Sequence, residues 1–301
     1  MKELFFQPGE VLQNRYRIDH LISSTGTSQV YKATDLRFLG KSWVLKVLKN
    51  IPSEQFKNLG KRWTSFNHPH LIKILDFFQE KENQILVMEY VNGQPLVELA
   101  GKTSTPFSEK QVLCWGLQCC DVIIYLQENL DDSFHFVCLS PKKILISAAG
   151  VVKLIPNPEF SWSTSTAVGI IGCSPPEIFE DPPLFNKTSD LYTLAAVLYR
   201  CLSGQDSQSV PFVFPQLRSL NAKISTSIDK ALARAIQPDP GKRYPDLPAF
   251  RGELYKCFLE LMKKQKTLPE TRDRTLILWK LVMALSAFSS LSLMAWLLFY
   301  R

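Results

Sequence analysis

The sequence predicts an α+β protein with a small β-rich N-lobe, a larger helical C-lobe and one C-terminal transmembrane helix. Residues 15–49 alternate between apolar and polar side chains as strands do, whereas long runs with helical spacing follow Gly93. The segment 281–300 contains no charged residue. We therefore expect an N-lobe at 1–91, a C-lobe at 92–262, a basic juxtamembrane segment at 263–280 and a transmembrane helix at 281–300.

The N-lobe is expected to contain several strands and one helix. The runs RYRIDHLI, SQVYKATD, KSWVLKVLK, LIKILDFF and QILVMEYV are short and rich in β-branched and aromatic residues, which favours strands. Between the third and fourth runs, residues 51–66 predict a helix. It should end before His68-Pro69, because the residue that precedes a proline disfavours helical geometry.

The C-lobe is expected to begin with a long helix. Ser108 can cap its N-terminus, and Glu109 lies favourably in its first turn. KILIS and VVKLI then predict a short hairpin around residues 148–150. The strongly apolar run SDLYTLAAVLYRCLSG predicts a further helix that Gly204 ends, and helices continue to about Leu261.

Composition and charge exclude several classes of function. The seven cysteines of the 301-residue chain form no CxxC pair, which favours a reduced, cytosolic domain over a disulfide framework or a zinc site. Of the net charge of +7, the segment 263–280 carries +4 from six basic and two acidic residues, and Arg301 carries one more. Residues 1–262 are left with only +2, so no nucleic-acid partner is indicated.

The apolar segment 281–300 predicts a single-pass anchor in the cell membrane. Twenty helical residues span about 30 Å, the thickness of the hydrocarbon core. The bases lie almost wholly on its N-terminal side, so residues 1–274 should be cytoplasmic, and MKELFFQPGE does not resemble a signal peptide. A buried core helix is the alternative. The bases of 263–280 are interpreted as a flank that fixes topology, with binding to an anionic surface as their alternative role.

A set of short motifs occurs in a characteristic order. They are Val30-Tyr31-Lys32-Ala33, Val44-Leu45-Lys46, His68-Pro69, Val87-Met88-Glu89-Tyr90, Leu139-Ser140-Pro141, Ile144-Leu145-Ile146, Pro175-Pro176-Glu177, Ser189-Asp190-Leu191-Tyr192 and Pro240 to Arg243. By this order and spacing, residues 10–262 resemble a protein kinase domain of the bacterial Hanks-type Ser/Thr family. The resemblance implies a two-lobed kinase-like fold with a nucleotide cleft between the lobes.

The resemblance also assigns roles to residues that this chain retains. Glu177 should pair with Arg243 and tie the activation segment to the C-lobe, and Asp190 should hold the catalytic-loop backbone. Lys46 matches the lysine that pairs with nucleotide phosphates. Four apolar residues match positions around adenine, although they could equally be ordinary core residues: Val30, Val44, Met88 and Leu145.

The residues that carry the chemistry in this family are replaced. The three glycines of the phosphate-binding loop fall on Ser23, Thr25 and Ser28, small hydroxyl residues that can still form a turn. Four further family positions hold residues of the wrong chemistry: Leu59 for the glutamate that pairs with Lys46, Cys138 for the catalytic aspartate, Lys143 for the metal-binding asparagine, and Pro156 for the metal-binding aspartate.

A count of acids supports this interpretation without depending on a residue-by-residue alignment. No Asp or Glu occurs from Ser133 to Pro158, whereas Lys142, Lys143 and Lys153 do. Mg²⁺ is held in such sites by carboxylate and amide oxygens together with phosphates. We therefore expect no cofactor and no metal, with ATP bound without Mg²⁺ as an alternative.

The sequence thus predicts a membrane-anchored, catalytically inactive kinase-like domain, a pseudokinase, that serves as a signalling scaffold or regulator for an unknown protein partner. The alternative is a divergent Ser/Thr protein kinase with residual ATP binding or phosphotransfer. Glu159 and Lys46 are the residues such an enzyme would use.

Overall fold

The computed structural model describes residues 4–25, 28–49, 51–102, 107–130, 139–156, 170–180, 186–205 and 212–267. It divides into two compact units, Met1–Cys257 and Phe258–Arg301. The expected N-lobe and residues 92–257 of the expected C-lobe belong to the first unit, whereas residues 258–262 belong to the second. Among the described residues no helix is long and apolar enough to cross a bilayer; the expected transmembrane segment 281–300 lies outside them.

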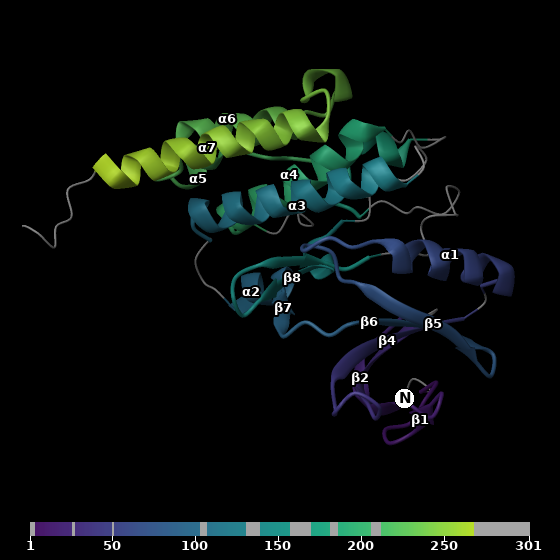
Figure 1. Ribbon diagram of the computed structural model, residues 1–301. Coiled ribbons are helices and arrows are strands. Elements are labelled where there is room, and N and C mark those ends of the chain that lie inside the picture. Colours follow the sequence, from purple (N-terminus) through teal and green to yellow (C-terminus); the bar gives the residue numbers. More distant parts are fainter. Residues whose placement is uncertain are drawn as a thin grey trace, which may run out of the picture. The chain divides into compact units, whose positions relative to one another are not determined.

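The N-lobe is built on an antiparallel sheet with strand order β1-β2-β3-β4-β6-β5 (Figure 1). Its strands are β1 (Val11–Leu12), β2 (Tyr16–Ser24), β3 (Ser28–Asp35), β4 (Ser42–Leu48), β5 (Ile74–Glu80) and β6 (Asn83–Glu89). The five strands expected from the sequence are β2 to β6. β1 is too short to have produced a periodic signal.

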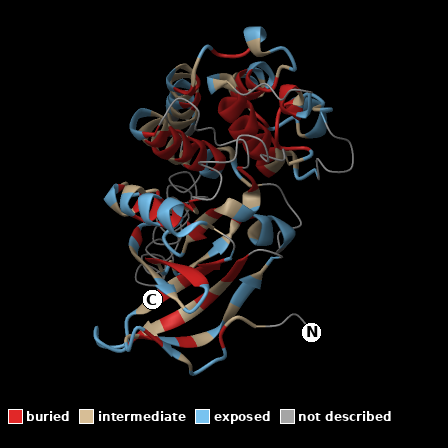
Figure 2. Cartoon of the chain, turned by 90° about the vertical axis from the view of Figure 1, so that its right-hand side faces the viewer, coloured by how far each residue is buried: buried red, intermediate tan, exposed pale blue. Residues whose placement is uncertain are grey.

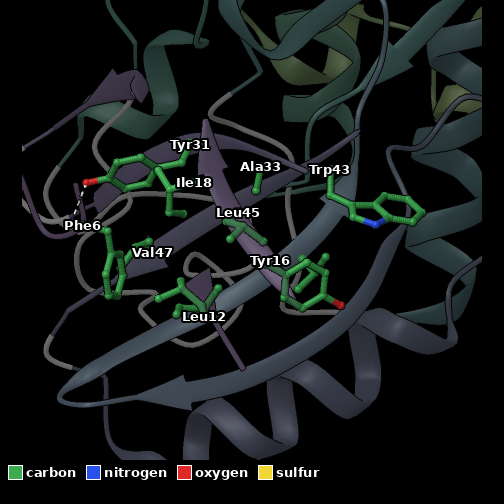
Figure 3. Packing of buried hydrophobic residues seen from close by; sticks show 11 residues of the cluster. Phe6, Leu12, Tyr16, Ile18, Tyr31, Ala33, Trp43, Leu45 and Val47 are labelled. Carbon is green, nitrogen blue, oxygen red and sulfur yellow. Dashed lines mark hydrogen bonds between the residues drawn. The ribbon is translucent and has the colours of Figure 1, made fainter. Parts of the chain in front are cut away.

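One face of this sheet is the hydrophobic core of the N-lobe. Alternate residues of β3, β4 and β6 point into it, among them Tyr31, Leu45 and Val87, each at most 1% exposed. Figure 3 labels Tyr31 and Leu45 in this core. Because successive side chains in a strand point to opposite faces, the residues between them lie on the other face. That second face carries Val30, Val44, Lys46 and Met88.

The helix expected over residues 51–66 is α1 (Ser53–Ser65). It buries Phe56, Leu59 and Trp63, and Phe56 packs edge-on against Phe77 of β5 with ring centroids 5.9 Å apart. Gly60 allows the close approach, since a Cβ atom there would lie only 2.2 Å from Cγ of Phe77. α1 is therefore held tightly against the sheet.

Gly60→Ala tests this close packing. In an open helix the change gains about 1 kcal/mol of helix propensity, but here we expect a net loss of about 1–3 kcal/mol in the free energy of unfolding, because the core is overpacked. Urea denaturation of the full chain followed by tryptophan fluorescence measures it. Gly252→Ala is the matched control: that helical glycine has nothing within 4 Å of its added Cβ, so this variant should be as stable as the parent or more so. Equal stabilisation by both substitutions would show that α1 is not closely packed.

The C-lobe is largely helical, and its central helices are among the most deeply buried parts of the chain (Figure 2). Its helices are α2 (Leu96–Lys102), α3 (Glu109–Asn129), α4 (Lys187–Ser203), α5 (Leu217–Leu220), α6 (Thr226–Ala235) and α7 (Leu247–Thr267). The 3₁₀ turns are η1 (Pro141–Lys143), η3 (Pro176–Phe179) and η4 (Pro240–Lys242). A small antiparallel sheet joins β7 (Gly93–Pro95), β8 (Ile144–Ser147) and β9 (Val152–Leu154).

The ends of the two long central helices follow from their sequences. Ser108 caps α3 in a full capping box with Gln111, as its position before the apolar run predicts. α4 starts slightly earlier than the sequence indicated, because Asn186 caps it in a box with Ser189. It ends at Gly204, whose φ of 69° is the left-handed conformation that glycine adopts without a steric penalty.

Candidate functional site

The second face of the N-lobe sheet gathers four residues that the sequence assigned to a nucleotide site. Val30 lies opposite Lys46, and Val44 lies opposite Met88, in neighbouring strand pairs. Residues directly opposite each other project from the same side of a sheet, so these four form one surface. Lys46 and Met88 are 5% and 4% exposed, whereas Val30 and Val44 are half-buried. The fifth residue, Leu145, lies on β8 in the second sheet and is half-buried.

The family partner of Lys46 has no equivalent in α1. Leu59, at that position, is buried with 4% exposure. Glu54 is the only acid in the helix, and it is exposed in the first turn. A glutamate that stabilises the lysine is thus replaced by an apolar side chain that packs in the core.

The turn between β2 and β3, where the family has its glycine loop, is closed by its own hydroxyl groups. The backbone N–H of Thr25 donates to the carbonyl oxygen of Ser28 at 2.8 Å, and the N–H of Ser28 donates to Thr25 Oγ1 at 3.1 Å. Thr25 Oγ1 and Ser28 Oγ lie 2.9 Å apart and share a further hydrogen bond. Backbone N–H groups of such a loop can bind phosphate only when they are unpaired, so these two are already occupied.

An N-terminal segment also reaches this region, which the sequence did not reveal. The backbone N–H of Phe5 donates to Gln29 Oε1 at 2.9 Å, next to Ser28. Phe6 is 1% exposed in the N-lobe core and its N–H donates to the hydroxyl oxygen of Tyr31 (Figure 3). The Lys49 ammonium lies 3.8 Å from the centre of the Phe5 ring. The start of β3 is thereby fixed to the chain's N-terminal segment.

In the C-lobe the β8–β9 hairpin brings together Lys143 and Pro156, the two positions at which the kinase family holds its metal ligands and at which this chain has lost them. Lys143 ends η1 immediately before β8, and Pro156 follows β9 by two residues. The N–H of Ile155 donates to the carbonyl oxygen of Lys143 at 2.8 Å, so Lys143 and Pro156 lie on adjacent backbone segments. Pro156 is buried. Cys138, at the position of the catalytic aspartate, lies outside the described residues.

An ion pair joins β6 to β9, and it was not foreseen from the sequence. Lys153 Nζ lies 2.9 Å from the Glu89 carboxylate, although the residues are 64 positions apart in sequence. Glu89 is thus engaged by a lysine of the hairpin. Within the ranges that the structure describes, no group of three or more His, Cys, Asp or Glu side chains is placed to hold a metal ion.

The structure brings Glu177 and Arg243 together in a buried bidentate ion pair. Arg243 Nη1 and Nη2 donate to the two carboxylate oxygens at 2.7 and 2.8 Å, and Ser189 Oγ donates to the same carboxylate at 3.0 Å. Asp190 is 1% exposed and accepts a 2.8 Å hydrogen bond from Gln127 of α3. Of the catalytic loop whose backbone Asp190 was expected to hold, residues 136–138 lie outside the described ranges.

This geometry agrees with comparisons to known proteins. The protein kinase domain family matches residues 16–243. Serine/threonine-protein kinase pkn3 of Myxococcus xanthus is 26% identical over 282 residues, covering 82% of this chain and 50% of that protein. Serine/threonine-protein kinase PrkC of Bacillus subtilis is 24% identical over 293 residues, covering 89% of this chain and 44% of that protein. The chain therefore spans about half or less of the length of these curated relatives.

Solved structures show the same fold. A mutant form of the kinase domain of Mycobacterium tuberculosis PknI superposes with a TM-score of 0.63 at 17% identity, covering 84% of this chain and 99% of that one. Rad53 residues 1–466 in complex with AMP-PNP superposes with a TM-score of 0.65 at 18% identity, covering 79% and 64%. At these identities the likeness shows a bilobal fold with a β-rich N-lobe and a helical C-lobe.

Proposed function

Because this chain belongs to the protein kinase domain family and is related to the bacterial Hanks-type Ser/Thr kinases, we propose that it is a pseudokinase, a member of the family that does not carry out metal-dependent phosphoryl transfer. It acts instead as a membrane-anchored scaffold or regulator of a protein partner.

The observation that carries this proposal is the adjacency of Lys143 and Pro156. The hydrogen bond from Ile155 to Lys143 brings together the two places where the family holds its metal ligands. One is occupied by a cation and the other by a side chain with no donor atom. A divalent cation bridging the phosphates needs oxygen ligands, so the residues present do not fit Mg²⁺.

Two further features support the same conclusion. The turn of Thr25 and Ser28 uses its own hydroxyl and carbonyl groups to satisfy the N–H groups of both residues. Leu59 leaves α1 without the carboxylate that positions the phosphate-binding lysine in active kinases. Metal binding and phosphate binding are thus disfavoured by different elements, and α1 lacks the family carboxylate at position 59.

The anchoring part of the proposal is supported by the sequence alone. The uncharged segment 281–300 follows the basic segment 263–280, and this order favours a single pass with the kinase-like domain in the cytoplasm. A cytoplasmic domain that is tethered to the membrane and lacks phosphoryl transfer can still influence signalling by binding a protein partner.

The alternative, a divergent kinase that still binds ATP, is favoured by one specific observation. Val30, Val44, Met88 and Lys46 share one face of the sheet, which is the surface an adenine ring and its phosphates would need. Nucleotide binding without a metal ion would be compatible with this surface.

A phosphorylation assay on the full chain in lipid nanodiscs separates the two functions. With ATP and Mg²⁺ or Mn²⁺ we expect no phosphate incorporation into the chain or a general protein substrate above the level of its Lys46→Ala variant. Metal-dependent incorporation that disappears in Lys46→Ala would overturn the proposal. Thermal denaturation with ATP, with and without Mg²⁺, identifies metal-free nucleotide binding, which would stabilise the chain equally in both conditions.

A further inference from the structure

Arg200, in the last turn of α4, has two of its three guanidinium nitrogens unused. Its Nη1 donates to the sulfur of Cys173 at 3.3 Å, and a thiol is a weak acceptor. Its Nε and Nη2 atoms are buried, and neither has a hydrogen-bond partner in the part of the chain that the structure describes. These two atoms form the edge of the guanidinium that donates two parallel hydrogen bonds to a carboxylate or a phosphate.

Arg243, in the same lobe, is by contrast fully hydrogen-bonded. Its three guanidinium nitrogens donate to five acceptors: both oxygens of Glu177 and the carbonyl oxygens of Thr188, Gln237 and Pro238. Arg15 and Arg251 likewise donate to the carboxylates of Asp35 and Asp121. A buried cationic donor without an acceptor destabilises the folded state. An oxyanion that reaches Arg200 would supply acceptors for both N–H groups and a counter-charge for the guanidinium.

Two segments that hydrogen-bond to the last turns of α4, around Cys173 and around Pro215, present apolar side chains to solvent. Cys173 belongs to a tight turn, closed by its N–H to the carbonyl oxygen of Ile170 at 2.9 Å, and this turn leaves Ile171 55% exposed. The neighbouring Tyr199 donates its hydroxyl to the carbonyl oxygen of Pro215 at 2.6 Å, which holds the segment 212–215 against α4.

That second segment, 212–215, also exposes apolar side chains. Val213 is 57% exposed, and the ring of Phe212 packs edge-on against Phe179 with centroids 5.7 Å apart while both remain partly exposed. Phe212 also adopts a φ of 63°, which is uncommon for a residue with a large side chain. The surface around this end of α4 thus combines several exposed apolar groups with one half-buried cation.

We propose that Arg200 is the anchor of a docking site for a protein partner, and that it binds an aspartate or glutamate flanked by apolar residues. The unused edge of the guanidinium supplies charge and geometric complementarity for the carboxylate, and the exposed apolar side chains favour a peptide over a free anion. Arg200 is half-buried as a residue, and binding requires its long side chain to rotate so that the buried Nε and Nη2 atoms face a ligand with two oxygens. This site does not depend on whether the domain transfers phosphate.

Nuclear magnetic resonance on the full chain in nanodiscs, with ¹⁵N-labelled arginine, tests the site through the Nε–H signal of Arg200. Titration with the peptide acetyl-Leu-Glu-Leu-amide should shift this signal in a saturable way. The matched peptide acetyl-Leu-Gln-Leu-amide should bind about tenfold more weakly, because it lacks the charge-assisted pair of hydrogen bonds. No shift, or equal affinity for the two peptides, overturns the proposal. So does tighter binding of inorganic phosphate than of the glutamate peptide, which would indicate a site for free anions.

Variants give a second readout through the anisotropy of fluorescent forms of the same peptides. Arg200→Gln should abolish the preference for glutamate, and Arg200→Lys should reduce it because an ammonium keeps the charge but not the paired donors. Arg37→Gln, an exposed arginine in the N-lobe, is the control and should keep the full preference. If Arg200→Gln folds and retains the tenfold preference, Arg200 is not the anchor.

Discussion

Replacing Glu177 with glutamine is expected to lower the free energy of unfolding by about 3–5 kcal/mol, because it leaves a buried arginine without a counter-charge. The side chain of Arg243 is 0% exposed and that of Glu177 is 6% exposed, so water cannot take over the lost interaction. The pair also closes a structural link, since Glu177 lies in η3 whereas Arg243 directly follows η4. Urea denaturation of the full chain, followed by tryptophan fluorescence, measures the change.

A surface pair provides the control for this prediction. Lys256 and Glu253 form an ion pair of 3.1 Å within α7, but the two side chains are 71% and 34% exposed. Glu253→Gln should therefore change the free energy of unfolding by at most about 0.5 kcal/mol. If Glu177→Gln has an effect as small as that of Glu253→Gln, the buried pair does not hold the end of the activation segment.

The double variant Glu177→Met/Arg243→Met separates the role of charge from that of packing. Removing both partners eliminates the uncompensated charge, and buried ion pairs replaced by apolar residues are often close to neutral in stability. We expect this double variant to be more stable than Glu177→Gln alone. Arg243 also donates to three carbonyl oxygens, so stability should recover only in part.

Much of the fold was predictable because its signals are local. The capping residue Ser108, the terminating Gly204 and the alternation of β3 and β4 each act within a few residues, and the structure has them where the sequence indicated. The elements that were missed are short: β1 has two residues, β7 has three, and α2 has seven. Segments of that length complete only one or two periods of a hydrophobic pattern. Whether they form a strand or a helix therefore depends on tertiary contacts.

The residues of the candidate site likewise fall into those that the sequence could identify and those that only the structure reveals. The replaced residues at Leu59, Lys143 and Pro156 could be found because the family resemblance fixes their positions in the chain. The pair Lys153–Glu89 could not, because it joins two strands 64 residues apart and depends on how the hairpin meets the N-lobe sheet. The unused edge of Arg200 could not be found from the sequence either, because it becomes visible only when the acceptors near the guanidinium are known.

Restoring the two missing metal ligands together is expected to create metal-dependent nucleotide binding. In Lys143→Asn/Pro156→Asp, adjacent backbones would carry an amide oxygen and a carboxylate, the ligand types that hold Mg²⁺ with phosphates in active kinases. Without ligands the variant should be less stable than the parent, since Pro156 is buried and a carboxylate there is desolvated. ATP with Mg²⁺ at about a hundred times its dissociation constant should then stabilise it by roughly 2.7 kcal/mol. Thermal denaturation with ATP, with and without Mg²⁺, measures both effects.

The single substitutions show whether the two positions act as one site. Pro156→Asp alone adds a carboxylate beside the Lys143 cation, so the two side chains should pair and the metal should gain little. Lys143→Asn alone supplies the amide oxygen but no carboxylate at position 156. The double variant Lys142→Asn/Pro156→Ala is the matched control: it changes the exposed neighbouring lysine and removes the proline, but it puts no metal ligand at position 143 or 156. We therefore expect metal-dependent stabilisation only in Lys143→Asn/Pro156→Asp. The same stabilisation in the parent chain would mean that a carboxylate from elsewhere already reaches the cleft, and the electrostatic argument for an inactive domain would fail.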